Sequence, residues 1–314
     1  MPDYIKINGE SVGRGEHKEI ILNIAKLPTH TMIDLPIYVF RAKAEGPTLL
    51  LSAGLHGDEI NGIEVIRRLI RDESIHPSAG TVIAIPIVNI YAFVYNSRNF
   101  PDNKDMNRSF PGSEKGSLAK YLAFILERQV LPHVDCAVDF HTGGTGKMNY
   151  PHIRCDCSVE RNLELAQAFS PPFIVNSKPP DHSFRKSATV MGKCMLTFEG
   201  GESLRFDELS IQEGMRGILR LMHVLNMRPG SPRLNDSKLL KNSFWNRAKY
   251  SGLFRANVEV GQAIRKSQIL GYITDPFGEV EYKIKSNSSG HIIGLNHMCV
   301  VNKGEALFHI GSNA

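Results

Sequence analysis

The chain has 314 residues, of which 42% are hydrophobic and 22% are charged, and its formal net charge is +5. This composition is typical of a folded globular protein and excludes an extended disordered chain. We expect no membrane span, because no apolar run approaches the ~18 residues that one needs. We also expect no nucleic-acid partner, because the excess of Lys and Arg after residue 226 is dispersed and lacks interleaved aromatic residues.

Apolar strand-like runs alternate with helical patterns over the first two-thirds of the chain. The predicted strands are residues 35–42, 48–53, 81–88, 137–140 and 195–198, and the predicted helices are residues 61–71, 118–130, 160–168 and 211–225. This alternation predicts an α/β fold with a mixed, mostly parallel sheet flanked by helices. We expect residues 1–227 to form the catalytic domain, with functional residues at the carboxyl ends of strands.

A segment rich in Pro, Gly and Ser, residues 228–232, precedes a different pattern. Helical periodicity disappears there, and short strand-like runs recur at residues 246–250, 252–255, 269–273, 280–286, 290–295 and 306–310. Residues 228–314 are therefore predicted to form a small all-β, barrel-like module, which resembles biotinyl/lipoyl carrier domains. The Lys that such carriers present in a tight hairpin is not evident, so we interpret the module as structural or as a surface for homo-oligomerisation.

The most informative stretch is His-Gly-Asp-Glu at residues 56–59, directly after an apolar run. Spacing of three would put His56 and Glu59 on the same face of a helical turn. His141 ends another apolar run, and Asp139 could support it from behind. A lone His-x-x-Glu pair arises by chance, but two His and one Glu at strand ends are the ligand set of a catalytic zinc site, which lowers the pKa of a water.

Five segments, in this order, resemble the succinylglutamate desuccinylase/aspartoacylase family, which belongs among zinc carboxypeptidase-like hydrolases. They are residues 55–59 (LHGDE), Arg98, residues 105–112 (DMNRSFPG), residues 139–141 (DFH) and residues 197–201 (TFEGG). The resemblance covers roughly residues 35–225 and implies a zinc carboxypeptidase-like fold. It also implies that His56, Glu59 and His141 hold one Zn²⁺ per subunit.

The resemblance implies the remaining roles as well. Glu199 matches the general base, and Arg98 matches the residue that polarises the scissile carbonyl and stabilises the oxyanion. Asn107 and Arg108 match the pair that binds a substrate carboxylate, which suits the fork of a guanidinium group.

Each of these residues also has an ordinary structural interpretation. Arg98 could be a surface residue of the polar loop 96–104, and Glu199 could be a solvated turn residue, in which case Glu202 would be a rival base. Lys104 and Arg185 are weaker candidates for substrate contacts, and we interpret both as ordinary residues.

The resulting hypothesis is a cytoplasmic, zinc-dependent amidohydrolase that removes an acyl group from an N-acyl amino acid or a similar small carboxylate. The polar segment 1–15 and the odd count of five Cys favour the cytoplasm. The sequence does not identify the acyl group, nor whether the bond cleaved is an amide or an ester. The predicted loops 148–157 and 177–188, which would select the substrate, carry no recognisable specificity code. The alternatives are a metallocarboxypeptidase that acts on peptides and a catalytically silent binding protein on the same fold.

Overall fold

A computed structural model describes residues 3–313 of the chain. Its N-terminal two-thirds contains ten strands: β1 (Tyr4–Ile7), β2 (Glu10–Gly13), β3 (His17–Lys26), β4 (Met32–Arg41), β5 (Ala44–Ser52), β6 (Ala79–Ile85), β7 (Cys136–Gly143), β8 (Lys147–Cys155), β9 (Phe173–Asn176) and β10 (Cys194–Glu202). The helices of the described residues are α1 (Asn61–Arg71), α2 (Ile90–Val94), α3 (Leu118–Ile125), α4 (Glu160–Phe169), α5 (Phe184–Val190) and α6 (Glu208–Val224), with short 3₁₀ or π turns η1 (Met106–Arg108), η2 (Leu126–Val130) and η3 (Leu131–His133).

The central sheet confirms the predicted α/β class, and it is mixed. Strands β10, β7, β5 and β6 are neighbours in that order and pair in parallel. Antiparallel strands flank this centre, with β8 beside β10 on one side and β4 and β3 beyond β6 on the other. Parallel pairing is thus concentrated in the four central strands, whose carboxyl ends meet at one edge, and the sheet as a whole is mixed.

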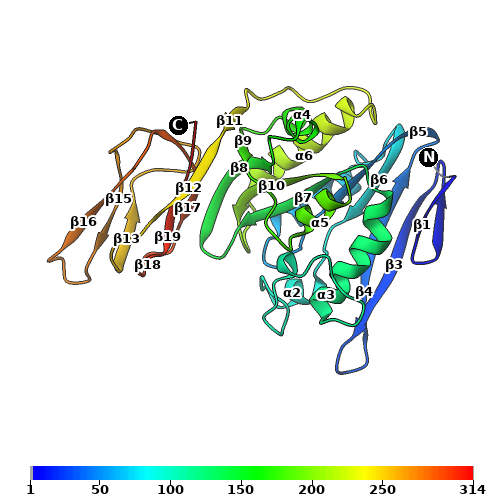
Figure 1. Ribbon diagram of the computed structural model, residues 1–314, viewed down its shortest axis with the longest axis horizontal. Helices are drawn as coiled ribbons and strands as arrows, with labels where there is room; N and C mark the ends of the chain where they lie inside the picture. Colours follow the sequence, from blue (N-terminus) through cyan, green and yellow to red (C-terminus); the bar gives the residue numbers. More distant parts are fainter. Residues whose placement is uncertain (1–2, 314) are drawn as a thin grey trace.

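Helices cover both faces of the central strands (Figure 1). Successive side chains of a strand point to opposite faces, so Leu50 and Ala137 pack in one core with residues of α3 and α5. Their neighbours Leu51 and Val138 pack in a second core with residues of α1, α4 and α6. Because both faces are buried, these strands appear in the sequence as continuous apolar runs.

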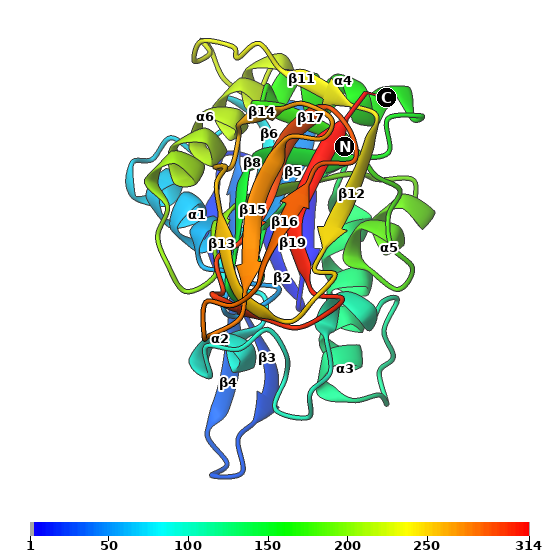
Figure 2. The same ribbon diagram turned by 90° about the vertical axis from the view of Figure 1, so that its left-hand side faces the viewer.

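The C-terminal region is all-β, as expected. Its strands are β11 (Lys238–Leu240), β12 (Asn242–Arg247), β13 (Gly252–Ala256), β14 (Ala263–Ile264), β15 (Ile269–Thr274), β16 (Glu281–Lys285), β17 (Gly290–Asn296), β18 (Val300–Val301) and β19 (Ala306–Ser312). A four-stranded sheet, β16-β15-β13-β18, faces β12, β19 and β17 (Figure 2). Phe254, Leu270 and Phe308 fill the core between them.

The module is joined to the N-terminal region by strand pairing. Strand β17 pairs antiparallel with β8, and β11 pairs in parallel with β9. The main sheet consequently runs from β12 through β19, β17 and β8 to the central strands without a break.

Two predicted loops contain regular structure. Residues 148–157 were expected to be a loop, but nearly all of them belong to β8, where Cys155 is fully buried. Residues 177–188 include the start of α5, which Ser183 caps by accepting a hydrogen bond from the Lys186 backbone N–H.

Within residues 3–313, no helix combines the length and the apolar character that crossing a membrane requires.

Candidate active site

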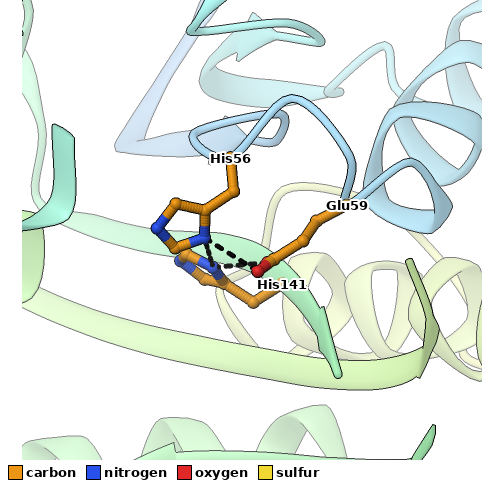
Figure 3. A group of neighbouring side chains, drawn as sticks. All are labelled: His56, Glu59 and His141. Atoms are coloured by element: carbon orange, nitrogen blue, oxygen red, sulfur yellow. Dashed lines mark hydrogen bonds and ion pairs between the residues drawn. The ribbon is translucent and has the colours of Figure 1, made fainter. Parts of the chain in front are cut away.

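The structure brings the three predicted metal ligands together (Figure 3). His56 and Glu59 lie in the turn between β5 and α1, and His141 lies on β7. Glu59 is 2.8 Å from the Nδ1 of His56 through Oε1 and 2.8 Å from the Nδ1 of His141 through Oε2. One ligand atom from each residue lies within 4.8 Å of the others, and all three side chains are buried. The predicted helical turn is instead a tight turn, in which the Glu59 N–H donates to the His56 carbonyl.

A carboxylate contacts the Nε2 atom of each imidazole, the nitrogen that faces away from Glu59. The Nε2 of His141 lies 2.8 Å from Asp139 Oδ2, and Asp139 also accepts a hydrogen bond from Ser52. The Nε2 of His56 lies 3.2 Å from Asp105 Oδ1. A carboxylate on the far nitrogen is the usual support of a metal-binding imidazole, because it fixes the tautomer that presents the other nitrogen to the ion. The donor set therefore fits a divalent metal such as zinc.

The electrostatics of this group favour positive charge. Burial works to raise the pKa of Glu59, but the neighbouring His56 and His141 hold it well below its usual range. Burial works to lower the pKa of His141, but Asp139 and Glu59 raise it well above its ordinary value. A buried site in which carboxylates outweigh the cost of burying a cation suits a bound divalent ion.

Glu199 stands beside this group on the adjacent parallel strand. It lies on β10 in register with His141 of β7. Burial raises the pKa of Glu199, and the nearby Arg154 opposes this shift. Its carboxylate accepts a hydrogen bond of 2.9 Å from the side-chain amide of Asn149. A carboxylate whose pKa lies closer to neutrality is better suited to accept and return a proton.

Arg98 reaches the metal group from the loop after α2. Its Nη1 donates to Glu59 Oε1 at 3.1 Å, while Nε and Nη2 donate to Asp105. Asp105, to which the sequence assigned no role, thus contacts both Arg98 and His56. Burial works to raise the pKa of Asp105, but these two neighbours keep it below its usual range.

Asn107 and Arg108 lie on the short turn η1, which Asp105 caps by accepting a hydrogen bond from the Asn107 N–H at 2.7 Å. Asn107 Oδ1 accepts from the Phe184 N–H at 2.9 Å. This contact fixes the amide orientation, so the Nδ2 donor is the group left for a ligand. Arg108 is exposed, and its Nη1 donates to the Asn107 carbonyl.

All seven predicted site residues line a single cavity of about 240 Å³. They share its wall with Asn149 and Arg154 of β8, Arg185 of α5 and Trp245 of β12. Arg185, which we interpret from the sequence as an ordinary residue, lies in this wall. The sequence carried no signal for Arg154 or Trp245, since β8 reads as a loop and Trp245 comes from the C-terminal module.

Two other weak candidates lie elsewhere. Lys104 pairs with Asp102 at 2.8 Å on the surface. Glu202, the rival base, contacts His297 at 3.3 Å, and the residues that line the cavity within 3–313 include Glu199 instead.

Comparison with known proteins gives the family. Residues 45–225, more than half of the chain, match the model of the succinylglutamate desuccinylase/aspartoacylase catalytic domain. The chain belongs to this family. A curated relative from Halomonas elongata, N-alpha-acetyl-L-2,4-diaminobutyric acid deacetylase, is 27% identical over 290 residues and covers 87% of this chain and 84% of its own length.

Solved structures of the family share the fold over nearly the whole chain. A succinylglutamate desuccinylase/aspartoacylase from Rhodobacter sphaeroides superposes with a TM-score of 0.85 at 25% identity, over 95% of both chains. The product-bound ectoine utilization protein EutE (DoeB) from Ruegeria pomeroyi gives a TM-score of 0.84 at 23% identity, also over 95% of both chains. Since these matches extend past residue 225, the β module is part of the shared architecture.

Membership of the succinylglutamate desuccinylase/aspartoacylase family makes the chain one of a group of deacylases. The matched residues 45–225 include all seven predicted site residues and both cavity arginines of β8 and α5. Trp245 lies outside the matched segment, so the module adds a wall residue that the catalytic domain does not contain.

Proposed function

We propose that this protein is a zinc-dependent amidohydrolase that removes an acyl group from the nitrogen of a small N-acyl amino acid. The observation that carries the proposal is the placement of Glu199 beside His141 on adjacent parallel strands, with His56 and Glu59 grouped around His141 in the same cavity. A metal group and a buried carboxylate base in one small cavity are the two parts that hydrolysis of an amide by an activated water requires.

His56, Glu59 and His141 would hold the ion. Zinc bound there would supply a water of lowered pKa and an electrophile for the carbonyl. Glu199 accepts the proton of the attacking water and returns it to the leaving nitrogen, a transfer that its raised pKa favours.

Arg98 and the pair on η1 position the substrate. The guanidinium of Arg98 lies at the rim of the metal group, where its N–H donors can stabilise negative charge on the carbonyl oxygen. The free amide donor of Asn107 and the guanidinium of Arg108 bind the α-carboxylate. Arg98 at the carbonyl oxygen and the Asn107–Arg108 pair at the α-carboxylate together fix the position of the scissile bond.

The size of the cavity supports a small substrate over a peptide. Its volume of about 240 Å³ lies below the ~300–1,000 Å³ that is usual for sites of drug-sized ligands. Trp245 of the module forms part of its wall, so the module bounds the space available to a substrate. Hydrolysis of peptides at rates comparable to those of N-acetyl amino acids would contradict this preference.

The proposal is tested with purified protein, its metal content and a panel of N-acyl amino acids. We expect one zinc per chain, loss of that zinc in His56→Ala, and a fall in hydrolysis of about 10²- to 10⁴-fold in Glu199→Gln while zinc is retained. A protein whose zinc content is unaffected by His56→Ala would refute the metal site. Full activity in zinc-loaded Glu199→Gln would refute the assigned base.

A further inference from the structure

A second cavity, of about 250 Å³, lies in the C-terminal module between the edge strands of its two sheets (Figure 2). Strand β12 ends the main sheet and β16 ends the four-stranded sheet, and both strands line this cavity. We call it the module pocket, and its lining comes from segments 245–250 and 282–287 together with Ile273. The side-chain amide of Asn246 donates to the Lys285 carbonyl at 3.0 Å and so ties the two edges together. The pocket is therefore formed by the fold itself.

The module pocket is lined by four cations and, among residues 3–313, by no carboxylate. Arg247 and Lys249 come from β12 and the segment after it, whereas Lys283 and Lys285 come from β16. None of the four forms an ion pair within the part of the chain that the structure describes. Arg247 donates to the Gly304 carbonyl at 2.9 Å instead. Cations that gather without a counter-charge repel one another, so an anion from outside the chain would be attracted to this pocket.

Flat aromatic surface lies in the same pocket. The rings of Tyr250 and Tyr282 stack with their centroids 3.8 Å apart and an angle of 15° between their planes. Both side chains nevertheless stay partly exposed, by 46% and 37%. Trp245 also lines the pocket, and the buried Ile273 adds apolar surface to its wall. Exposed aromatic faces of this kind are surfaces on which the planar ring of a ligand can stack.

Protection of the sheet edges explains only part of this arrangement. Lysines on an edge strand discourage pairing with another chain, which accounts for Lys283 and Lys285 on β16. The same requirement disfavours the tyrosine pair, because exposed rings at an edge promote association. It also gives no reason for cations from both edges to converge on one cavity without a carboxylate among them. Binding of a ligand accounts for the cations and the rings together.

The pocket suits a small anion that combines a flat ring with a phosphate group. A phosphate monoester carries a charge of about −1.5 to −2 at pH 7 and three strong acceptor oxygens. It can therefore engage several ammonium and guanidinium donors at once. A single-stranded nucleic acid would need a groove that follows successive phosphates, whereas this cavity lies between two edge strands and has the size of one ring with its phosphate.

We propose that the module pocket binds a phosphorylated ring compound of the mononucleotide class. The ring lies against the Tyr250–Tyr282 pair, and the phosphate lies among the four cations of β12 and β16. This site lies outside residues 45–225, which match the catalytic domain of the family, and it does not rest on the proposed function. Trp245 lines both the module pocket and the catalytic cavity, so the two sites adjoin at this residue.

The test uses Trp245 as its reporter, because the chain contains one tryptophan. The zinc-loaded full chain is titrated with adenosine monophosphate at low salt, and its tryptophan emission is followed. Adenosine keeps the ring without the phosphate, ribose phosphate keeps the phosphate without the base, and inorganic phosphate is the bare anion. We expect a saturable change with adenosine monophosphate and an affinity that is roughly tenfold or more weaker for each of the three partial ligands, the size of one lost stacking or charge-assisted contact.

Variants locate the binding site, and calorimetry repeats each titration without relying on Trp245. The double variant Lys283→Gln, Lys285→Gln should weaken binding of adenosine monophosphate by roughly 5- to 20-fold through two lost charge contacts. Tyr282→Ala should weaken it by roughly 5- to 100-fold through lost stacking. Lys266→Gln is the matched control, because Lys266 is an exposed lysine between β14 and β15 that lies outside the pocket. This control should keep the wild-type affinity.

Four results would overturn the inference. The first is the absence of saturable emission change and heat with millimolar adenosine monophosphate. The second is a partial ligand that binds as tightly, since ring or charge alone would then suffice. The third is unchanged affinity in both the double lysine variant and Tyr282→Ala, which would place the ligand in the catalytic cavity. The fourth is far tighter binding of a short single-stranded oligonucleotide, which would indicate a nucleic-acid groove. None of these results depends on hydrolysis of N-acyl amino acids, so the proposed function is tested separately.

Discussion

The hydrogen bond from Asn149 to Glu199 offers a direct test of the assigned base. Glu199 must be ionised to accept a proton. Activity should therefore rise with pH as the carboxyl group of Glu199 is deprotonated. The amide of Asn149 donates to the carboxylate at 2.9 Å and thereby works against the rise in pKa that burial causes. Removing the donor in Asn149→Ala destabilises the charged form and raises the pKa of Glu199 further.

The magnitude follows from the kind of bond. A hydrogen bond to a charged group contributes about 1.5–3 kcal/mol, and about 1.4 kcal/mol corresponds to a factor of ten. On the acidic limb of the profile, Asn149→Ala should therefore lose roughly tenfold or more in kcat/KM. On the alkaline plateau, where Glu199 is ionised in both proteins, the loss should be much smaller. The assay is the pH dependence of kcat/KM for one N-acyl amino acid with zinc-saturated protein.

Asn296→Ala is the matched control for this experiment. Asn296 is a buried amide on β17, in register with Lys147 of β8, and it donates to the Ala306 carbonyl instead of to Glu199. Its profile should keep the wild-type midpoint. An Asn149→Ala profile that coincides with the wild type, or an equal shift in Asn296→Ala, would refute the reasoning about Glu199.

Three further predictions concern the metal, the base and the packing beneath them. Asp139→Asn should weaken zinc affinity by about 10- to 100-fold in a chelator competition, because Asp139 orients His141 from behind; unchanged affinity would contradict this. Glu199→Gln should lower kcat by about 10²- to 10⁴-fold at unchanged zinc content. Gly62→Ala should destabilise the fold by ~1–3 kcal/mol in denaturant unfolding, since its new Cβ would lie 2.2 Å from the Phe140 Cβ, whereas Gly144→Ala meets nothing within 4 Å.

The sequence predicted the central strands and their helices well because their burial is uniform. Helix α1 was placed at residues 61–71, as observed, since Val65, Ile66 and Leu69 form one apolar face against the sheet. Strand β8 was missed for the opposite reason. It contains the buried polar residues Asn149 and His152, and its partner β17 lies more than 130 residues away in the chain. Alternation between polar and apolar residues cannot indicate a strand whose polar side chains are buried at a site.

The site shows the same division. His56 and Glu59 follow the apolar strand β5, and His141 lies near the carboxyl end of the neighbouring β7, so topology alone brings them to one edge. Asp105, Arg154 and Trp245 were not assigned because their positions depend on a capped turn, on β8 and on the module. These residues are positioned by pairing between segments that are distant in the sequence. Periodicity within one segment carries no information about such pairing.

The continuity of the sheet leads to a last prediction about the boundary at residue 228. Removing residues 228–314 would take away β17 and β11, and the edges of β8 and β9 would lose the partners they have in the intact chain. It would also uncover Phe173 and Val175, which now pack with Leu240 and Ile293. An exposed apolar edge strand is a template for aggregation.

A chain ending at residue 227 should therefore be recovered mainly as aggregate, and any soluble fraction should lack Trp245 in the cavity wall. Size-exclusion chromatography of the truncated and full chains, with zinc added to both, measures this directly. The full-length variant Trp245→Ala is the control, because it removes the same wall residue and keeps every strand pairing. A monodisperse truncated chain with full activity would show that the module contributes neither to the stability of the sheet nor to the site.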